Sequence, residues 1–334
     1  MGSLCGVAVL KVFPKWVGAV LALWCLGGCG CQTPSSSSGA SVEQAKRGSS
    51  VLRLVQERPI AALLSRKDDE GRLEASGVAA VDGHFYVVLD NVGHVARLTQ
   101  DLEVNAPGVW QSKRGQGQGY EALAWAPKAG RFYAVIEAVK RKKKKHRAII
   151  HAFTPEFELL EQGEIDFDFK GENKGVEGLA VVNIEGQGEV LVALCEAPGG
   201  QKKGKAGQPG LLLVLKRTQA GDWAVERRLD LPKEARFADF SDIAVDAEGR
   251  VAVVSQEDSA MWVGKLDADA WRFEGPGEVH RFPTDAQGRM IYCNVEGVSW
   301  LSPQRVVVVS DRAKRDQPAR CRTKEQSVHI FDLL

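Results

Sequence analysis

The sequence lacks the patterns that identify several common classes of site. It has no Cys-x-x-Cys pair for a zinc ribbon or a thioredoxin-like centre, and its six histidines lie without metal-binding spacing. No Gly-x-Ser-x-Gly turn for a nucleophilic serine is present. Lys+Arg 44 and Asp+Glu 43 leave a formal net charge of +1, which argues against a nucleic-acid-binding protein. No apolar run approaches the roughly 20 residues of a membrane-spanning helix.

The first 28 residues instead have the layout of a lipoprotein signal peptide. Lys11 and Lys15 precede an apolar run over residues 16–26. A basic region followed by about 7–15 apolar residues is typical of an export signal. The run ends in Leu26-Gly27-Gly28-Cys29, which resembles the bacterial lipobox. We therefore expect cleavage before Cys29 and a lipid on its thiol, with an ordinary signal peptide and a chance cysteine as the alternative.

Residues 29–50 are expected to be a tether between this lipid and a folded body over residues 51–334. Ser35-Ser36-Ser37-Ser38-Gly39 and few apolar residues are typical of a flexible linker. The membrane is then a partner through the lipid on Cys29. Gly30 is not the aspartate that favours inner-membrane retention in lipoproteins. We expect an exported protein anchored in the bacterial cell envelope, at the outer membrane where the cell has two.

Three cysteines fall in the body, Cys195, Cys293 and Cys321. Export permits disulfides, so Cys293 and Cys321 are able to pair. The alternative is that all three are small buried apolar residues. The residues alone leave both interpretations open.

The body repeats one pattern five times. Each copy has a small or acidic polar residue, usually a glycine or alanine next, and then an alternating apolar strand, a turn and a second apolar strand. X-Gly turns such as Asp82-Gly83 and Glu248-Gly249 favour hairpins, because glycine adopts the positive φ of tight turns. The copies begin at Ser76, Glu121, Glu177, Asp242 and Glu296.

Each repeat has room for four short strands, which is typical of a β-propeller. The second repeat predicts strands at 121–125, 132–136 and 147–153 and a fourth within 157–169. The last repeat lacks one strand, and residues 51–58 form a spare strand-like run. We therefore predict an all-β, single propeller of five four-stranded blades, closed by an N-terminal strand. Six blades is the alternative, if residues 59–75 contain further strands.

Two columns of polar residues align across the repeats. The first column starts the first strand and the second column follows the end of the second strand. Because these strands are antiparallel, both columns should lie at one edge of each blade and surround one mouth of the central channel. Eight of the ten positions are acidic, against 43 of 334 in the chain. The first column is Ser76, Glu121, Glu177, Asp242 and Glu296, and the second is Asp90, Glu137, Glu196, Gln256 and Asp311.

Crowded carboxylates raise one another's pKa values, pair with bases or bind a metal. Oxygen ligands without clustered His or Cys suit Ca²⁺ or Mg²⁺. The eight acids are therefore candidate ligands of Ca²⁺. Two alternatives remain: the first-column acids accept backbone N–H bonds and join blade to blade, or the acids pair with bases that follow the second column at Lys140, Arg141, Arg312 and Lys314. The basic run Lys140–Arg147 is expected to be a solvated loop.

The phrases Gly119-Tyr120-Glu121-Ala122-Leu123-Ala124, Val176-Glu177-Gly178-Leu179-Ala180 and Val295-Glu296-Gly297-Val298-Ser299 resemble two related propeller families. These are the esterase-like-activity-of-phytase family and the SdiA-regulated family of bacterial envelope proteins. The resemblance covers residues 70–334. It implies a calcium-compatible propeller with phosphoester or ester hydrolysis, and the acids at 121, 177, 242 and 296 match the recurring glutamate of these families. Ser76 and Gln256 depart from that pattern.

We therefore expect a binding or scaffold protein of the cell envelope. Its acidic mouth would take an envelope ligand or protein partner together with Ca²⁺. The alternative function is a metal-dependent, phytase-like hydrolase of phosphoesters or esters at the same mouth. The sequence identifies no catalytic residue and no nucleic-acid partner.

Overall fold

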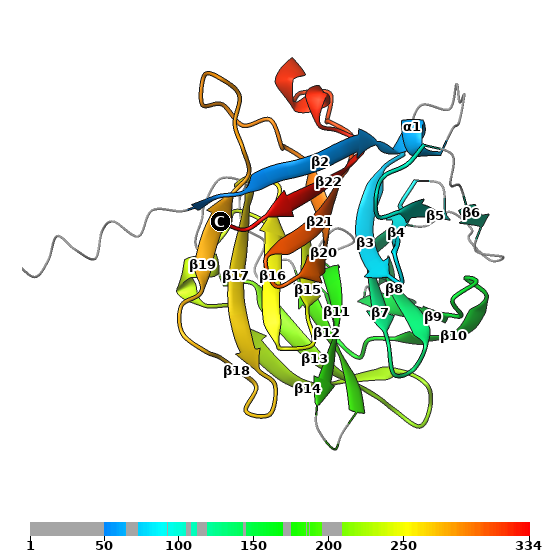
Figure 1. Cartoon of the computed structure of the whole chain (residues 1–334). Coiled ribbons are helices and arrows are strands. Elements are labelled where there is room, and N and C mark those ends of the chain that lie inside the picture. Colours follow the sequence, from blue (N-terminus) through cyan, green and yellow to red (C-terminus); the bar gives the residue numbers. More distant parts are fainter. Residues whose placement is uncertain are drawn as a thin grey trace, which may run out of the picture. The chain divides into compact units, whose positions relative to one another are not determined.

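The computed structural model describes residues 50–334 except 65–72, 92, 105–107, 112–118, 143–144, 170–174, 185, 187 and 196–208. The predicted signal peptide, Cys29 and all of the tether but its last residue lie outside the described residues. Residues 48–334 form one compact unit (Figure 1). No helix among the described residues is long and apolar enough to span a membrane.

The strands form five sheets, each with four strands in an antiparallel series. The first blade is β3 (Ala75–Val81), β4 (His84–Leu89), β5 (His94–Thr99) and β6 (Gly108–Gln111). The second is β7 (Tyr120–Ala126), β8 (Arg131–Lys140), β9 (His146–Phe153) and β10 (Leu159–Glu164). The third is β11 (Val176–Ile184), β12 (Gly188–Cys195), β13 (Leu211–Arg217) and β14 (Trp223–Asp230).

The last two blades use the N-terminal strands as well. The fourth is β15 (Asp242–Val245), β16 (Arg250–Ser255), β17 (Ala260–Asp267) and β19 (Glu278–Arg281), with β18 (Arg272–Phe273) paired to β17 and β1 (Ser50–Val51) parallel to β19. The fifth is β20 (Val295–Ser302), β21 (Arg305–Ser310), β22 (Ser327–Asp332) and β2 (Arg53–Pro59). The helices α1 (Ile60–Leu63), η2 (Lys233–Ala235) and η3 (Ala319–Thr323) lie in connections between strands.

The five-blade prediction is therefore confirmed, and so is closure by an N-terminal strand. β2 pairs antiparallel with β22, from Arg53 opposite Asp332 to Pro59 opposite Ser327. Polar contacts of Glu57 also hold β2 to the fifth blade. Glu57 accepts hydrogen bonds from Lys324 and from the hydroxyl of Tyr292 at 3.3 Å, and it contacts His329 at 3.1 Å. These contacts lower the pKa of Glu57 to about 2, chiefly through His329.

Both faces of a blade are buried, because each blade is packed between two others. β21 shows this clearly with four consecutive valines. Val307 and Val309 pack with the first blade, whereas Val306 and Val308 pack with the fourth. Successive side chains of a strand point to opposite faces, so an unbroken apolar run is what such a strand requires.

The inner strands β3, β7, β11, β15 and β20 form a closed ring in which each contacts two neighbours. Their backbones come very close at the glycine that follows the first column. A Cβ atom on Gly77 would lie 2.8 Å from the backbone N of Leu123, and one on Gly178 would lie 2.7 Å from that of Ile243. No side chain fits at that distance, which explains why glycine follows the polar residue in three of the five repeats.

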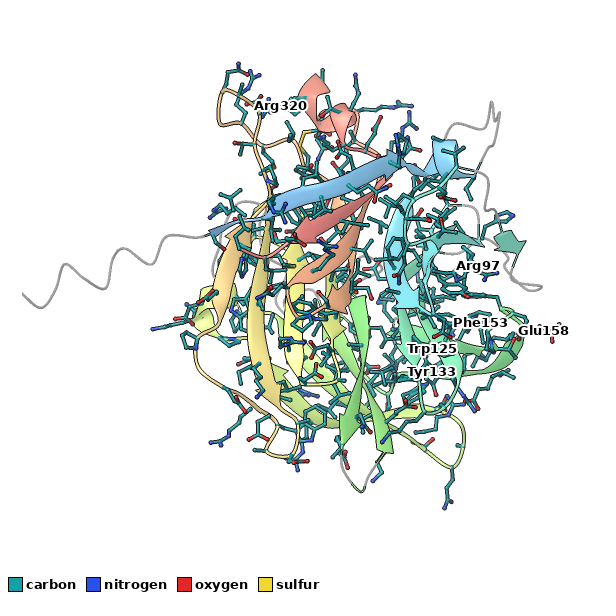
Figure 2. The ribbon with its side chains drawn as sticks, viewed as in Figure 1. Arg97, Trp125, Tyr133, Phe153, Glu158 and Arg320 are labelled. Atoms are coloured by element: carbon teal, nitrogen blue, oxygen red, sulfur yellow. A yellow bond between two sulfur atoms is a disulfide. The ribbon has the colours of Figure 1, made fainter. Side chains whose placement is uncertain are left out.

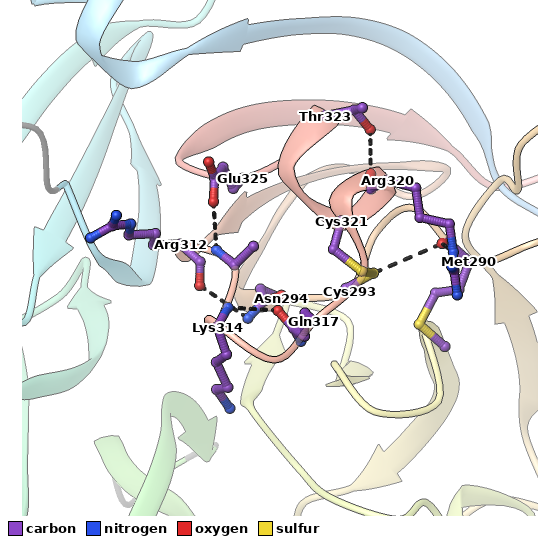
Figure 3. Close-up of a disulfide and its surroundings, with 11 residues drawn as sticks. Met290, Cys293, Asn294, Arg312, Lys314, Gln317, Arg320, Cys321, Thr323 and Glu325 are labelled. Atoms are coloured by element: carbon purple, nitrogen blue, oxygen red, sulfur yellow. Dashed lines mark hydrogen bonds between the residues drawn. A yellow bond between two sulfur atoms is a disulfide. The ribbon is translucent and has the colours of Figure 1, made fainter.

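A disulfide joins Cys293 to Cys321, with 5.4 Å between the Cα atoms (Figure 3). It links the segment before β20 to the segment between β21 and β22, so both lie at the end of the propeller where the inner strands begin. Arg320 Nε also donates to the carbonyl of Met290 at 2.9 Å. Cys195 is buried and its thiol is free. Two of the three cysteines therefore form a disulfide, and the third is a small buried residue.

Candidate functional site

The acidic columns meet at the end of the channel where the inner strands begin. Four inner strands have a register shift there that leaves the first-column residue opposite no partner, at Ser76, Glu121, Glu177 and Glu296. Such a β-bulge redirects the side chain of the extra residue. Asp90 and Asp311 follow directly after β4 and β21, and Glu137 lies within β8 at a register shift between Ile136 and Val139, so the described acids of the two columns come together.

Glu121 and Glu296 are the innermost acids of this mouth. Burial, together with repulsion from Glu137 and then Asp90 and Asp311, raises the pKa of Glu121 to about 8. Burial also raises the pKa of Glu296 well above its usual range, with added repulsion from Asp311 and Glu121. Each keeps part of its side chain exposed. They therefore line an opening rather than a closed core.

The second column supplies the outer acids of the mouth. Burial raises the pKa of Asp311 to about 7, against the backbone N–H of Arg312 and with repulsion from Asp90 and Glu74. Burial and then the charge of Glu74 raise the pKa of Asp90 to about 6. Glu137 Oε1 accepts the backbone N–H of Gly175 at 3.1 Å, which fixes it beside the third blade. We call Asp90, Glu121, Glu137, Glu296 and Asp311 the acidic mouth.

Two further acids influence this mouth and were not predicted. Glu74 precedes β3 and raises the pKa values of Asp90 and Asp311 by repulsion. Asp239 lies in the connection before β15; burial raises its own pKa to about 6, and its charge contributes to the shift of Glu296. Both residues lie outside the repeated strand pattern, which is why the alignment of repeats did not include them.

Asp242 does not belong to this mouth, and its alignment with the first column was wrong by one residue. Asp242 pairs with Val254, the second-to-last residue of β16. In three other blades the second-to-last residue of the second strand pairs with a glycine, which is Gly77, Gly178 or Gly297. No register shift interrupts the pairing of β15 with β16. A one-residue slip reverses the direction of a strand side chain. Ser241 is therefore the residue of the fourth blade that corresponds to Glu121.

The carboxylate of Asp242 joins three inner strands. It is 1% exposed and accepts the backbone N–H groups of Ile243 at 2.8 Å and of Val298 at 2.9 Å, with a third from Leu179. Leu179 and Val298 belong to strands that are not neighbours in the ring, so the carboxyl group lies on the channel side of β15. Burial raises its pKa well above the usual range. Of the predicted acids, Asp242 is the blade-to-blade contact that the sequence left open.

The remaining predicted acids belong to the third blade. Glu177 is half-buried at the start of β11, and its charge adds to the effect of burial that raises the pKa of the Cys195 thiol. Glu196 lies outside the described residues.

In the fifth blade, one of the bases predicted to pair with the acids acts on the mouth through its charge. Lys314 partly offsets the charges of Asp311 and Glu296. Arg141 instead binds Glu164 at 2.7 Å, and Lys145 binds Asp168 at 2.9 Å. Arg141 and Lys145 of the basic run are therefore directed to acids at the end of β10 and just after it rather than to the mouth.

Several polar atoms at the mouth lack a hydrogen-bond partner among the described residues. They include the hydroxyl of Ser241, which is 3% exposed, Oδ1 of Asp90 and Oδ1 of Asn294. Such atoms need a ligand or water to satisfy them. The oxygen donors suit a hard cation, but no three His, Cys, Asp or Glu side chains in the described part converge as metal ligands. The described acids thus supply charge at the mouth without forming a closed coordination shell.

No family model and no curated protein matches the sequence. Solved β-propeller structures are similar to it at low identity. Regucalcin from Agrobacterium tumefaciens, a calcium-binding protein, has a TM-score of 0.46 at 10% identity over 85% of this chain and 96% of its own. The PQQ-bound aldose sugar dehydrogenase from Streptomyces coelicolor has a TM-score of 0.43 at 12% identity over 83% and 98%.

A third propeller, virginiamycin B lyase from Staphylococcus aureus, has a TM-score of 0.39 at 8% identity over 85% of this chain and 100% of its own. The activities in these names differ. Nothing among these proteins identifies the phytase-like or SdiA-regulated families. The chain is an all-β, five-bladed propeller, and its function rests on its own residues.

Proposed function

We propose that this propeller binds a positively charged ligand at its acidic mouth, with Ca²⁺ as the simplest candidate. The observation that carries the proposal is that Glu121, Glu296, Asp311 and Asp90 lie at one opening, where burial and then the charge of neighbouring carboxylates raise all four pKa values. The unpartnered Ser241 hydroxyl faces the same opening by its register and adds a neutral oxygen donor.

At neutral pH the free mouth holds protons in place of a cation. Glu121, with a pKa of about 8, is mostly protonated at pH 7, and Asp311, with a pKa of about 7, is half protonated. A cation that binds between them favours the ionised carboxylates and displaces these protons. Binding should therefore tighten as the pH rises from 6 to 9.

Ca²⁺ accepts six to eight oxygen ligands, including backbone carbonyls and water. The acidic mouth would contribute Glu121, Glu296 and Asp311 to such a shell, with backbone and water oxygens completing it. An organic cation such as a polyamine needs no coordination shell and is served by the same charges. Both ligands are cations, and a direct titration with each one shows which of them binds.

The mouth is less suited to binding a phosphoester substrate than to binding a cation. It is an anion, and the described acids would repel it, with Lys314 the nearby base that opposes them. We therefore propose ligand binding as the function and expect no phosphoester turnover with or without Ca²⁺. Turnover that rises with Ca²⁺ and falls in Glu121→Gln would favour the hydrolase.

The location of the protein is a second part of the proposal. We propose an exported lipoprotein attached to the cell envelope by a lipid on Cys29 and acting at the outer membrane. The Cys293–Cys321 disulfide supports export, because such bonds persist in oxidising compartments. A labelled fatty acid should be incorporated into the unmodified protein and into Cys31→Ser but not into Cys29→Ser.

Calorimetric titration of the intact protein with CaCl₂ and with spermidine at pH 8 tests the function. We expect saturable binding of at least one of them, weakened about tenfold or more in Glu121→Gln and Glu296→Gln. Glu248→Gln is the matched control, because Glu248 is an exposed acid in the turn at the opposite end of the inner strands. Equal affinity in all variants, or no binding of either cation, would contradict the proposal.

A further inference from the structure

The channel has a second end, opposite the acidic mouth, with different chemistry. Beyond the glycine level the inner strands continue in register, so their side chains form successive rings. The first is aliphatic and buried, and it lines a cavity whose lining residues include none of the acidic mouth. It consists of Val78, Leu123, Leu179, Ile243 and Val298.

The second ring consists of small side chains. Four alanines and one serine occupy the same register position, where large residues would fill the axis. The space that they leave is part of a cavity of about 300 Å³. This volume is at the lower end of the range of small-ligand pockets, about 300–1,000 Å³. The residues are Ala79, Ala124, Ala180, Ala244 and Ser299.

Two tryptophans stand at the third level of the same cavity. Trp125 on β7 and Trp300 on β20 are both half-buried (Figure 2 labels Trp125). Each ring is held in place. Trp125 packs on Phe132 with 4.6 Å between ring centroids, and Trp300 Nε1 donates to the carbonyl of Ala244 at 3.4 Å. The cavity therefore offers two fixed aromatic rings and an alanine-lined interior.

The charged groups around this cavity are hydrogen-bonded, and their charges balance. Lys128 Nζ donates to Asn183 at 2.6 Å, and the backbone N–H groups of Lys128 and Ala129 bind the carboxylate of Glu189. Asp246 accepts from Arg250 Nε at 2.6 Å. Two of these four residues are positive and two are negative, so an ion that entered here would meet no net charge from them. The cavity thus favours a neutral ligand.

Backbone polar groups also face this channel. The inner strand is the edge of each blade, and every second residue of an edge strand directs its N–H and C=O away from the sheet. The N–H of Ala80 points across to the next blade, where it donates to the hydroxyl of Ser299 at 3.2 Å. A ligand with its own donors and acceptors is therefore better suited than a hydrocarbon.

We propose that this cavity binds a neutral saccharide of one or two rings. The apolar C–H face of a sugar ring packs on an indole face, and its hydroxyl groups match the backbone edges and Ser299. An aromatic ligand without hydroxyl groups would pack on the tryptophans but would leave the backbone edges and Ser299 without hydrogen bonds. The site lies beyond the ring of aliphatic residues from the acidic mouth, so it does not depend on the proposed function there.

Saturation-transfer NMR on the intact, unmodified protein tests this inference. Glucose, N-acetylglucosamine and their β-1,4-linked disaccharides are the probes, with benzyl alcohol as the apolar comparison. We expect transfer to the ring C–H protons of at least one saccharide, with affinity reduced tenfold or more in Trp300→Ala and Trp125→Ala. Glu121→Gln should bind the saccharide as well as the unmodified protein.

Trp271→Ala is the matched control, because Trp271 is a half-buried tryptophan in the β17–β18 hairpin, outside the cavity. It should retain saccharide binding. Ala180→Leu tests the cavity without removing an aromatic ring and should block binding, while thermal unfolding checks that each variant folds. Absence of transfer to every saccharide, or transfer to benzyl alcohol alone, would overturn the inference.

Discussion

The two ends of the channel are built from the same five strands but carry opposite chemistry. The mouth contains carboxyl groups that repel one another, whereas the far cavity contains alanine methyl groups and two tryptophan rings, and its nearby charges are hydrogen-bonded and balance in sign. About three residues of strand, or roughly 10 Å, separate the two levels. In this propeller the register of the inner strands determines where along the channel a site lies. The side chains at that register position determine which ligand the site favours.

Removal of the disulfide should have the largest effect and act on the mouth. Cys293→Ala with Cys321→Ala opens a loop with a sequence separation of 28 residues, and the loss should be about 3–4 kcal/mol of unfolding free energy. Chemical denaturation measures it. Cation affinity should fall as well, since Asp311 and Lys314 lie on the released segment, while saccharide binding should persist. Cys195→Ala is the control and should keep cation affinity.

Substitutions of Asp242 test whether this residue is a structural contact between blades rather than a part of the acidic mouth. Asp242→Ala leaves the backbone N–H groups of Ile243 and Val298 unpaired in a buried position, which should cost about 2–3 kcal/mol. Asp242→Asn retains an acceptor oxygen and should cost less. Neither change should alter cation affinity per folded molecule. Loss of affinity in Asp242→Asn as large as in Glu121→Gln would return Asp242 to the mouth.

The pH dependence of stability separates the mouth acids from the far end with a smaller effect. A carboxyl group whose folded pKa is raised favours the folded state most below its unfolded pKa, and this contribution is lost as the pH rises through the folded value. Glu121 and Asp311 should therefore destabilise the protein between pH 4.5 and 8. Glu121→Gln should raise stability at pH 8 by about 1–2 kcal/mol and have little effect at pH 5.

Thermal unfolding as a function of pH measures this effect. The matched control Glu248→Gln should follow the unmodified protein throughout. A stability that is flat from pH 5 to 8, or that rises equally in both variants, would mean that the mouth acids are not held in repulsion.

The blades were predictable because their signals are local. Alternating apolar residues and X-Gly turns indicate each hairpin without reference to the rest of the chain. The spare strand before residue 59 and the strand missing after Glu296 then require closure between the chain ends. The observed β2, at Arg53–Pro59, lies within two residues of the predicted 51–58.

The site was only partly predictable, because it depends on register and on connections. Ser241-Asp242 resembles the other repeat starts, and only the missing bulge in β15 shows that the serine is the equivalent residue. Glu74 and Asp239 lie in segments without periodicity, so no alignment of strands finds them. The disulfide depends on how two connections fold over the mouth, and cysteine spacing does not specify that.

The central claim is that protons at the mouth give way to a cation, and calorimetry in paired buffers tests it most directly. Ca²⁺ or spermidine is titrated at pH 7 into the intact protein in two buffers that differ in ionisation enthalpy. The account predicts release of at least one proton per cation at pH 7 and of fewer at pH 9, since Glu121 and Asp311 have pKa values of about 8 and 7. Binding at pH 7 without proton release, or the absence of binding at both pH values, would contradict it.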